Sequence, residues 1–411
     1  MFNFSLNKKK KKKLKKVLII HRYFYPDKSS CSTIIHEIAK FISKFNYQID
    51  VITSHPQRFS SKTKIMNYEP KSKDKINIVR LNLMRESKNP YSRIVNALYL
   101  GFWILLRSIS TDYEIIISTS TPPILTAFFA AIASKFYKSR FIYYCMDINP
   151  EIGILNGDFS NIYLQRLMLF IDKWTLKEAS PVVVHSVDMK NTLLSRKLYK
   201  DLDIEIINNF AVPSKDQKLL NENKIKREEK NSLKVIFAGN LGRFQGLETT
   251  IKAFALLNKY KGIKLTLLGN GSERENLLKM SSKLNANVEF IDHVSYDKAK
   301  SIIYESDIGL VSLIPNMYKY AYPSKTMAYL EQGIPVIAMI EEESELAINM
   351  KKFGYGFVTP INDSLSLSKL IFQLSENKSW KLKMKKALDQ AFLEEFSCEV
   401  ILEKWKKIIL R

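Results

Sequence analysis

The chain has 411 residues, 46% of them hydrophobic and 26% charged, which is enough to build two domains with separate cores. Its formal net charge is +23, and eight of its lysines fall within the first sixteen residues, all in the run KKKKKKLKK. That run lacks the apolar core of a secretory signal, and three cysteines without repeated spacing (Cys31, Cys145 and Cys398) predict neither a disulfide scaffold nor a zinc site. These features exclude the secreted, disulfide-rich class and favour a cytoplasmic protein.

The lysine block at residues 1–15 has three interpretations: a solvated, disordered tail, a segment attracted to anionic lipid, or a nucleic-acid-binding arm. Each basic residue close to an anionic membrane contributes about 1 kcal/mol of attraction. No helix-turn-helix, zinc-finger or aromatic RNA-binding motif accompanies the charge, so we expect no nucleic-acid partner. The block therefore predicts a disordered basic tail that is drawn to an anionic membrane surface.

Two apolar runs, residues 94–106 and 115–133, are the candidates for membrane contact. The first is shorter than the roughly 20 residues that span a bilayer, and Ser, Thr and two prolines interrupt the second. Residues 94–106 could lie in the lipid interface, with Tyr99 and Trp103 at headgroup depth, or form a helix buried against a sheet. We expect a peripheral protein on the inner face of the plasma membrane.

Apolar strand patterns alternate with helical patterns over residues 16–212, which predicts an N-terminal domain with a parallel sheet covered by helices on both faces. The predicted strands are residues 16–20, 48–54, 113–119, 140–146, 181–186 and 205–210, and the main predicted helices are 33–45, 126–137 and 160–178.

Residues 213–232 are almost wholly polar and charged and predict a linker, after which the alternation restarts over 233–391. Strands are expected at 233–239, 263–269, 288–292, 307–313, 335–340 and 354–360, with helices between them. The chain is thus predicted to be α/β, with two doubly wound Rossmann-like domains facing a central cleft, where ligands bind beyond the carboxyl ends of the strands.

Two turns at predicted strand ends carry phosphate-binding chemistry. Ser324 and Lys325 stand directly before a helix that ends in a Gly-x-Pro turn, and helix starts attract anions because their first N–H groups lack internal partners. After the strand at 233–239, Gly242 and Arg243 form a turn in which the arginine could contact phosphate oxygens. The glycines do not match GxGxxG, so an ordinary turn with a solvated arginine is the alternative.

These segments resemble a known family when taken in order. VIFAGNLGRFQGLETTIKAF, LTLLGNGSERENL, DIGLVSL and YPSKTMAYLEQGIPVIA resemble the donor-binding domain of GT-B glycosyltransferases of family four. The N-terminal half agrees through VLIIHRYFYPD, IIISTSTPP and MDINPE, and the set is similar to bacterial enzymes that build O-antigen, capsule or exopolysaccharide. The resemblance covers nearly all of residues 16–411.

The resemblance implies transfer of a sugar, with retention of configuration, from a nucleotide diphosphate sugar to a polyprenyl-diphosphate-linked acceptor. The subgroup suggests uridine as the base, and neither a metal nor another cofactor is expected. The C-terminal domain would hold the donor and the N-terminal domain the acceptor. A final helix over 392–411 would cross back to the N-terminal domain. A sugar-nucleotide epimerase and a non-catalytic sugar-nucleotide-binding protein are the alternatives.

Site residues follow from the same resemblance. Lys325 and Arg243 are expected to bind the donor diphosphate, with the backbones of Gly242 and Ser324 close by. Asp147, in MDINPE, is expected near the reacting sugar, although a helix cap or turn former is the alternative.

Departures from the family pattern add further candidates. Many members carry two glutamates eight positions apart, and this chain has Tyr320 and Ala328 there, so Glu331, one turn later, could contact the ribose instead. A lysine common in the family is Gln245 here. On the acceptor side Glu151 is a second choice to Asp147. His21 could also reach the cleft, although a structural histidine is the alternative.

Overall fold

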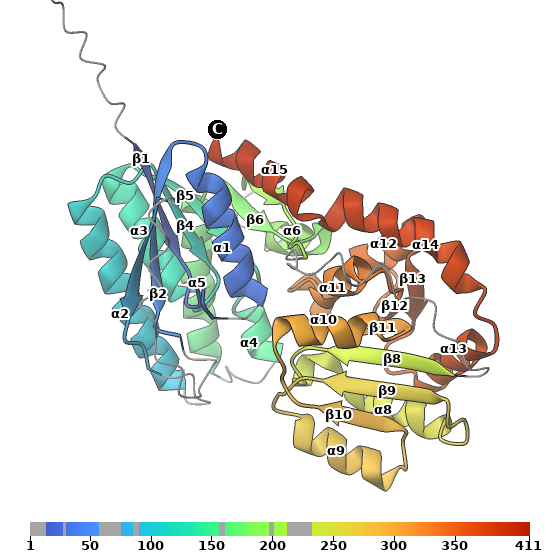
Figure 1. Cartoon of the computed structure of the whole chain (residues 1–411). Helices are drawn as coiled ribbons and strands as arrows, with labels where there is room; N and C mark the ends of the chain where they lie inside the picture. Colours follow the sequence, from blue (N-terminus) through green and yellow to red (C-terminus); the bar gives the residue numbers. More distant parts are fainter. Residues whose placement is uncertain are drawn as a thin grey trace, which may run out of the picture.

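The computed structural model describes residues 14–27, 30–56, 75–84, 90–155, 161–196, 201–211 and 232–411. Each half of the chain forms a domain around its own parallel sheet (Figure 1). Apart from Leu14, Lys15 and Ser232, the predicted basic tail and linker lie outside the described residues.

The N-terminal sheet has seven strands in the order β3-β2-β1-β4-β5-β6-β7, and neighbouring strands are parallel. The strands are β1 (Lys15–Ile20), β2 (Tyr47–Ser54), β3 (Ile76–Leu81), β4 (Ile115–Thr119), β5 (Arg140–Tyr144), β6 (Val182–Val184) and β7 (Ile204–Ile206). Val17 and Ile19 enter the core on one side of this sheet, and Leu18 and Ile20 enter the core on the other. Because both faces are buried, these strands are continuous apolar runs, which is why the sequence predicted most of them.

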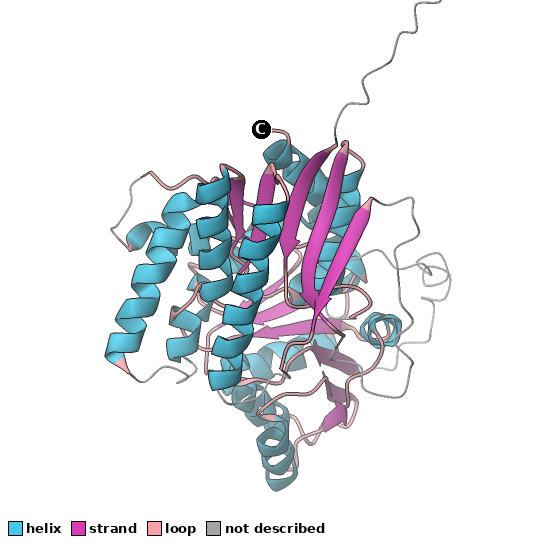
Figure 2. Cartoon of the chain, turned by 90° about the vertical axis from the view of Figure 1, so that its left-hand side faces the viewer, coloured by secondary structure: helices cyan, strands magenta, loops and turns pink. Residues whose placement is uncertain are grey.

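Helices cover both faces of this sheet. The core on one side includes residues of α1 (Ser30–Ser43) and α15 (Cys398–Ile409). The other side carries α2 (Pro90–Ser110), α3 (Leu125–Tyr137), α5 (Ile162–Glu178) and α6 (Val187–Ser195). Helices α2, α3 and α5 stand side by side (Figure 2). Within the described residues, no helix is both long and apolar enough to cross a bilayer.

Residues 94–106 have one side buried in the domain and one side exposed. This segment lies in α2, whose Leu100 and Ile104 are buried in the core while Tyr99 is exposed. Trp103 is partly buried and packs against the core cluster. Its ring falls on the flank of the helix that faces the domain.

The C-terminal sheet has six strands in the order β10-β9-β8-β11-β12-β13, all parallel to their neighbours. The strands are β8 (Leu233–Ala238), β9 (Ile263–Leu268), β10 (Val288–Ile291), β11 (Ile308–Ser312), β12 (Val336–Met339) and β13 (Gly356–Thr359). One face carries α8 (Leu247–Leu256), α9 (Arg274–Lys283) and α13 (Ser364–Glu376). The other carries α10 (Tyr296–Tyr304), α11 (Lys325–Glu331), α12 (Glu345–Phe353) and α14 (Trp380–Ala391).

The end of the chain returns to the N-terminal domain, but later than residue 392. Residues Phe392–Phe396 form a π-helical turn, and Phe396 packs into the C-terminal core. Ser397 then caps α15, whose Val400 N–H donates to the serine hydroxyl at 3.4 Å. Trp405 is fully buried in the N-terminal core, with its ring 5.0 Å from that of Tyr144. The crossing segment is therefore α15 rather than one continuous helix from 392.

Two helix starts, one from each domain, face each other across the domain interface. The Val187 N–H of α6 donates to a Glu345 carboxylate oxygen at 2.5 Å, and the Glu345 N–H of α12 donates to Asp188 at 2.8 Å. Each carboxylate thus accepts a hydrogen bond from a first-turn N–H of the other helix, and that N–H has no acceptor within its own helix. Burial raises the pKa of both carboxyl groups. This reciprocal cap is a polar joint between the two domains.

Candidate active site

The loops that follow β5 and β11 meet at the domain interface. Asp147 and Ala321 form an isolated antiparallel bridge, and the Ile148 N–H donates to the Tyr320 carbonyl at 2.9 Å. Tyr320 also packs against the core of the N-terminal domain. Because Lys325 starts α11 only four residues after Ala321, candidate residues from both domains lie in one region.

Lys325 is a cation without a counter-charge. Its Nζ donates to the Gln245 side-chain carbonyl at 2.8 Å and lies 4.5 Å from the centre of the Phe237 ring. No carboxylate pairs with it among the described residues. Burial lowers the pKa of Lys325 to about 8. A buried ammonium group held only by an amide and a ring is suited to an anionic ligand, whose charge would restore the ordinary pKa.

Glycines let two loops approach one another beside this lysine. Gly239, at the end of β8, has φ +143°, and a Cβ there would lie 2.9 Å from Lys325 Cε. Gly269, at the end of β9, has φ +140°, and its Cβ would lie 2.0 Å from the Gly239 carbonyl oxygen. The Leu241 N–H then donates to the Asn270 carbonyl at 2.9 Å, which ties the loops together. Side chains at either glycine would push this backbone away from Lys325.

The other predicted diphosphate contacts are more open. The Arg243 side chain is 70% exposed, and its Nε lies 3.2 Å from a Glu273 carboxylate oxygen. It follows Gly242 at the start of a short 3-10 turn, Arg243–Gln245. Ser324 is exposed, but the helix it precedes has only seven residues, so Lys325 is the stronger feature of this turn.

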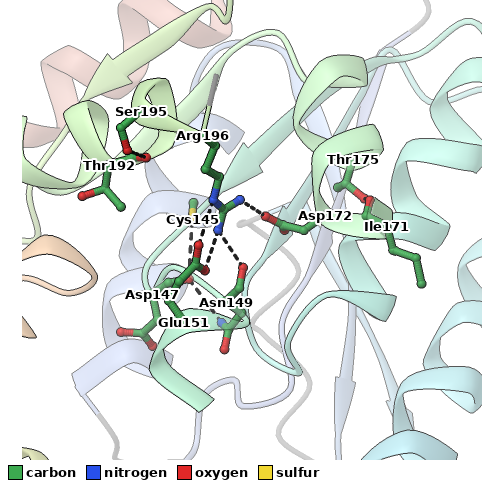
Figure 3. Close-up of polar contacts among 10 residues, drawn as sticks. All are labelled: Cys145, Asp147, Asn149, Glu151, Ile171, Asp172, Thr175, Thr192, Ser195 and Arg196. Atoms are coloured by element: carbon green, nitrogen blue, oxygen red, sulfur yellow. Dashed lines mark hydrogen bonds and ion pairs between the residues drawn. The ribbon is translucent and has the colours of Figure 1, made fainter. Parts of the chain in front are cut away.

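Asp147 presents a carboxylate that no described residue binds. Its backbone is fixed, because its N–H donates to the Ser120 hydroxyl at 3.1 Å and its carbonyl accepts from the Asn149 amide at 3.2 Å. The side chain points away from the neighbouring Arg196 (Figure 3). Burial raises the pKa of Asp147 to about 6. A half-buried carboxylate with a pKa close to neutrality is suited to accept a proton or to orient a hydroxyl group.

Glu151, the second acceptor-side candidate, is instead part of a buried clamp around Arg196 (Figure 3). The guanidinium donates to Glu151 at 2.6 and 3.0 Å, to Asp172 at 2.6 Å and to the Asn149 carbonyl at 3.0 Å. Burial opposes the charged form, but the two carboxylates outweigh it and raise the pKa of Arg196. The clamp joins α4 (Glu151–Leu155), α5 and the end of α6, and so holds the loop that carries Asp147.

We expect Glu151→Gln to lower the free energy of unfolding by about 1–2 kcal/mol, because it removes one charge from a buried, hydrogen-bonded pair. Turnover per folded molecule should stay within about twofold of wild type, since this side chain is committed to Arg196. Denaturant unfolding and initial rates would measure the two effects. Glu178→Gln is the control, because its partner Lys135 is exposed and such pairs contribute little. If Glu151→Gln lowered the rate without lowering stability, Glu151 would again be a candidate for direct contact with the acceptor.

Two other candidates have structural partners. The Glu331 carboxylate lies 2.6 Å from Lys300 Nζ, and both side chains are buried. This ion pair links α10 to α11, and it engages the Glu331 carboxylate that was expected to contact the ribose. His21 is buried, with Nδ1 2.7 Å from the Thr119 hydroxyl between β1 and β4. Both side chains therefore have roles within the fold.

One residue that supports the site has no signal in the sequence. The Tyr329 hydroxyl accepts from the Ala238 N–H at 2.9 Å and donates to the Leu310 carbonyl at 3.2 Å. It thereby links the end of β8 to β11 beneath Gly239. In the sequence Tyr329 is one apolar position of α11, and only the folded sheet brings it to those backbone groups.

Comparisons with known proteins agree with this geometry. Residues 220–391 match the family model "Glycosyl transferases group 1". An uncharacterized glycosyltransferase of Methanocaldococcus jannaschii is 25% identical over 417 aligned residues, covering 96% of this chain and 98% of that protein.

Solved structures share the fold at low identity. HepE of Anabaena in complex with UDP and glucose has a TM-score of 0.68 at 16% identity, covering 96% of this chain and 99% of that one. WaaG, a glycosyltransferase involved in lipopolysaccharide biosynthesis, has a TM-score of 0.67 at 12% identity over the same shares. The two Rossmann-like domains are thus the GT-B fold, as predicted. The protein is a glycosyltransferase.

Proposed function

We propose that this glycosyltransferase moves a sugar, with retention of configuration, from a uridine diphosphate sugar to a polyprenyl-diphosphate-linked acceptor in the synthesis of a bacterial surface polysaccharide. The observation that carries the proposal is Lys325, an unneutralised cation at the glycine loops of the C-terminal domain. A diphosphate matches that charge, and UDP is the ligand bound by HepE.

In the transfer, the bond between the anomeric carbon and the diphosphate oxygen breaks, and the acceptor hydroxyl oxygen bonds to that carbon. Negative charge grows on the departing diphosphate, where a fixed ammonium group stabilises it best. We assign this role to Lys325, because its Nζ has an amide partner and no carboxylate partner among the described residues. Arg243, which is exposed beside Glu273, would contact a phosphate at the edge of the site. Asp147 accepts the proton of the acceptor hydroxyl. No metal or cofactor takes part in this scheme.

The acceptor would be presented at the inner face of the plasma membrane. WaaG, which has the same fold, is involved in lipopolysaccharide biosynthesis, and the net charge of +23 suits an anionic surface. In the sequence, the lysine block directly precedes β1 of the N-terminal domain, the domain that supplies Asp147.

A binding screen tests the donor. Ligand-observed NMR with UDP, GDP, ADP and NAD, each at the same concentration, should show selective binding of UDP. All four ligands carry a diphosphate, so a difference in binding between them reports recognition of the base or of the groups attached to the diphosphate. Selective binding of GDP or ADP would overturn the choice of uridine, and binding of none would favour a non-catalytic member of the fold.

A further inference from the structure

An unusual surface covers one side of the N-terminal domain. The exposed side of α2 carries five large apolar residues at spacings of four, four, four and three, which follow one face of the helix. They are Ile94, Leu98, Phe102, Leu106 and Ile109. Phe102 is 58% exposed although Leu100 and Ile104, on the opposite side of the helix, fill the core.

Helix α5 repeats this arrangement on the far side of α3. Its exposed apolar residues are Ile162, Tyr163, Leu164, Leu167 and Phe170, and Tyr163 and Phe170 are 76% and 69% exposed. Its buried residues, including Asp172 and Leu176, lie on the opposite side. Helix α3 contacts both α2 and α5, so the three helices form one layer (Figure 2). We call the exposed residues of α2 and α5 the apolar face.

Basic residues outnumber acidic ones on the helices of the apolar face. Helices α2 and α3 contain no acidic residue at all. In α5, Asp172 is bound by Arg196 and Glu178 by Lys135, while Arg166 and Lys173 lie on the side of the apolar residues. Long basic side chains beside an apolar stripe can reach lipid phosphates while their stems stay among apolar groups. The surface is thus complementary to an anionic bilayer.

We infer that the protein docks on an anionic lipid bilayer through the apolar face, with α2 and α5 lying in the interfacial layer. This inference rests on the proposed membrane-borne acceptor but not on the identity of the donor. Monomeric soluble proteins rarely expose apolar patches of this extent without a partner. Each apolar group that leaves water contributes, and the basic residues add attraction that salt weakens.

Docking in this way would bring lipid to the acceptor side of the site. Helices α2 and α5 begin at the edge of the sheet where the strands end, because each follows a parallel strand. Leu155, at the end of α4, is exposed at the same edge, and α4 starts four residues after Asp147. The inferred orientation therefore lets a lipid-linked sugar approach Asp147 from the bilayer.

The test compares two paired variants with a matched control. Leu98→Ser/Phe102→Ser alters α2, Tyr163→Ser/Phe170→Ser alters α5, and Leu256→Ser/Leu382→Ser removes apolar residues of similar exposure from the C-terminal domain. Co-sedimentation with vesicles of phosphatidylcholine containing 30% phosphatidylglycerol would measure partitioning. Both apolar burial and attraction to the anionic lipid contribute to such binding. We expect at least a tenfold loss for each N-terminal pair and less than a twofold change for the control.

Two further measurements make every outcome informative. UDP binding and thermal unfolding should match wild type in all three variants, which separates lost docking from lost folding or lost donor binding. The inference would be overturned if both N-terminal pairs partitioned onto vesicles as wild type does. It would also be overturned if neither pair weakened binding and only deletion of residues 2–13 abolished it. A wild-type dimer that is seen by sedimentation without lipid and that the same substitutions dissociate would overturn it as well, because the face would then bind a second copy.

Discussion

Replacing Lys325 with alanine should lower kcat by about 100- to 1,000-fold, the range seen when one preorganised electrostatic contact to a developing negative charge is lost. UDP affinity should fall as well, since the same ammonium group is the only described cation next to the Gly239 loop without a carboxylate partner. The fold should survive, because removing an unneutralised buried charge relieves a desolvation cost. Initial rates, UDP titration and thermal unfolding would be measured together.

The pH dependence of Lys325 gives a second, independent readout. Burial lowers the pKa of this lysine to about 8 in the folded chain, below the ordinary value of 10.5. Between these values the unfolded chain binds more protons, so the wild-type protein should gain stability relative to the variant as the pH rises from 8 to 10.5. UDP should bind less well over the same range as the cation is lost.

Lys279→Ala is the matched control for this lysine, because Lys279 is an exposed residue of α9 in the same domain. It should leave the rate, UDP affinity and stability unchanged. If Lys325→Ala turned over like this control, the lysine would have no part in binding the leaving group, and Arg243 would become the main candidate.

Substituting Asp147 with asparagine should lower kcat by about 100- to 10,000-fold, the range for loss of a positioned acid or base. The backbone contacts to Ser120 and Asn149 do not involve the carboxylate, so the loop should keep its shape. Wild-type activity should rise through about pH 6 as the carboxyl group ionises, and the variant should lack this limb. A pH–rate profile with a saturating donor would test this.

Stability should change in the opposite sense to activity. Burial raises the pKa of Asp147 from 3.8 to about 6, so the folded chain holds its proton more tightly than the unfolded chain does. The stability from that proton is present at acid pH and is lost as the pH rises through about 6. At neutral pH the asparagine variant should therefore be at least as stable as wild type. Asp112→Asn, an exposed site, is the control. Equal rates for Asp147→Asn and Asp112→Asn would indicate that Asp147 shapes the turn and takes no part in the reaction.

The sequence predicted the two sheets well because parallel strands with two buried faces are long apolar runs. It also predicted that Lys325 and Asp147 are both candidates for the central cleft, since ligands bind beyond the carboxyl ends of the strands in this architecture. The sequence could not show which side chains bind one another in the fold. Glu151 is bound by Arg196, which lies 45 residues later at the end of α6, and no local pattern encodes that contact.

Helix periodicity was also ambiguous on the surface. The sequence predicted a helix over residues 160–178 that covers the sheet, and Tyr163 and Phe170 of this helix face outward. Apolar residues at helical spacing show that one face avoids water, but they do not say whether protein or lipid covers it. Likewise Glu331 sits one turn from the family position, and only the fold reveals that Lys300 already binds it.

The return of α15 has a consequence for how the chain matures on the ribosome. Trp405, Ile401 and Ile408 complete the core beneath the first domain, yet they are synthesised after the whole of the second domain. Domains usually fold in the order in which they emerge. Here the β-sheet made first must wait for α15, while the second domain already has its own hydrophobic core from residues 232–396. Translation stalled before Ser397 would leave an open apolar face on the nascent first domain, a natural target for chaperones.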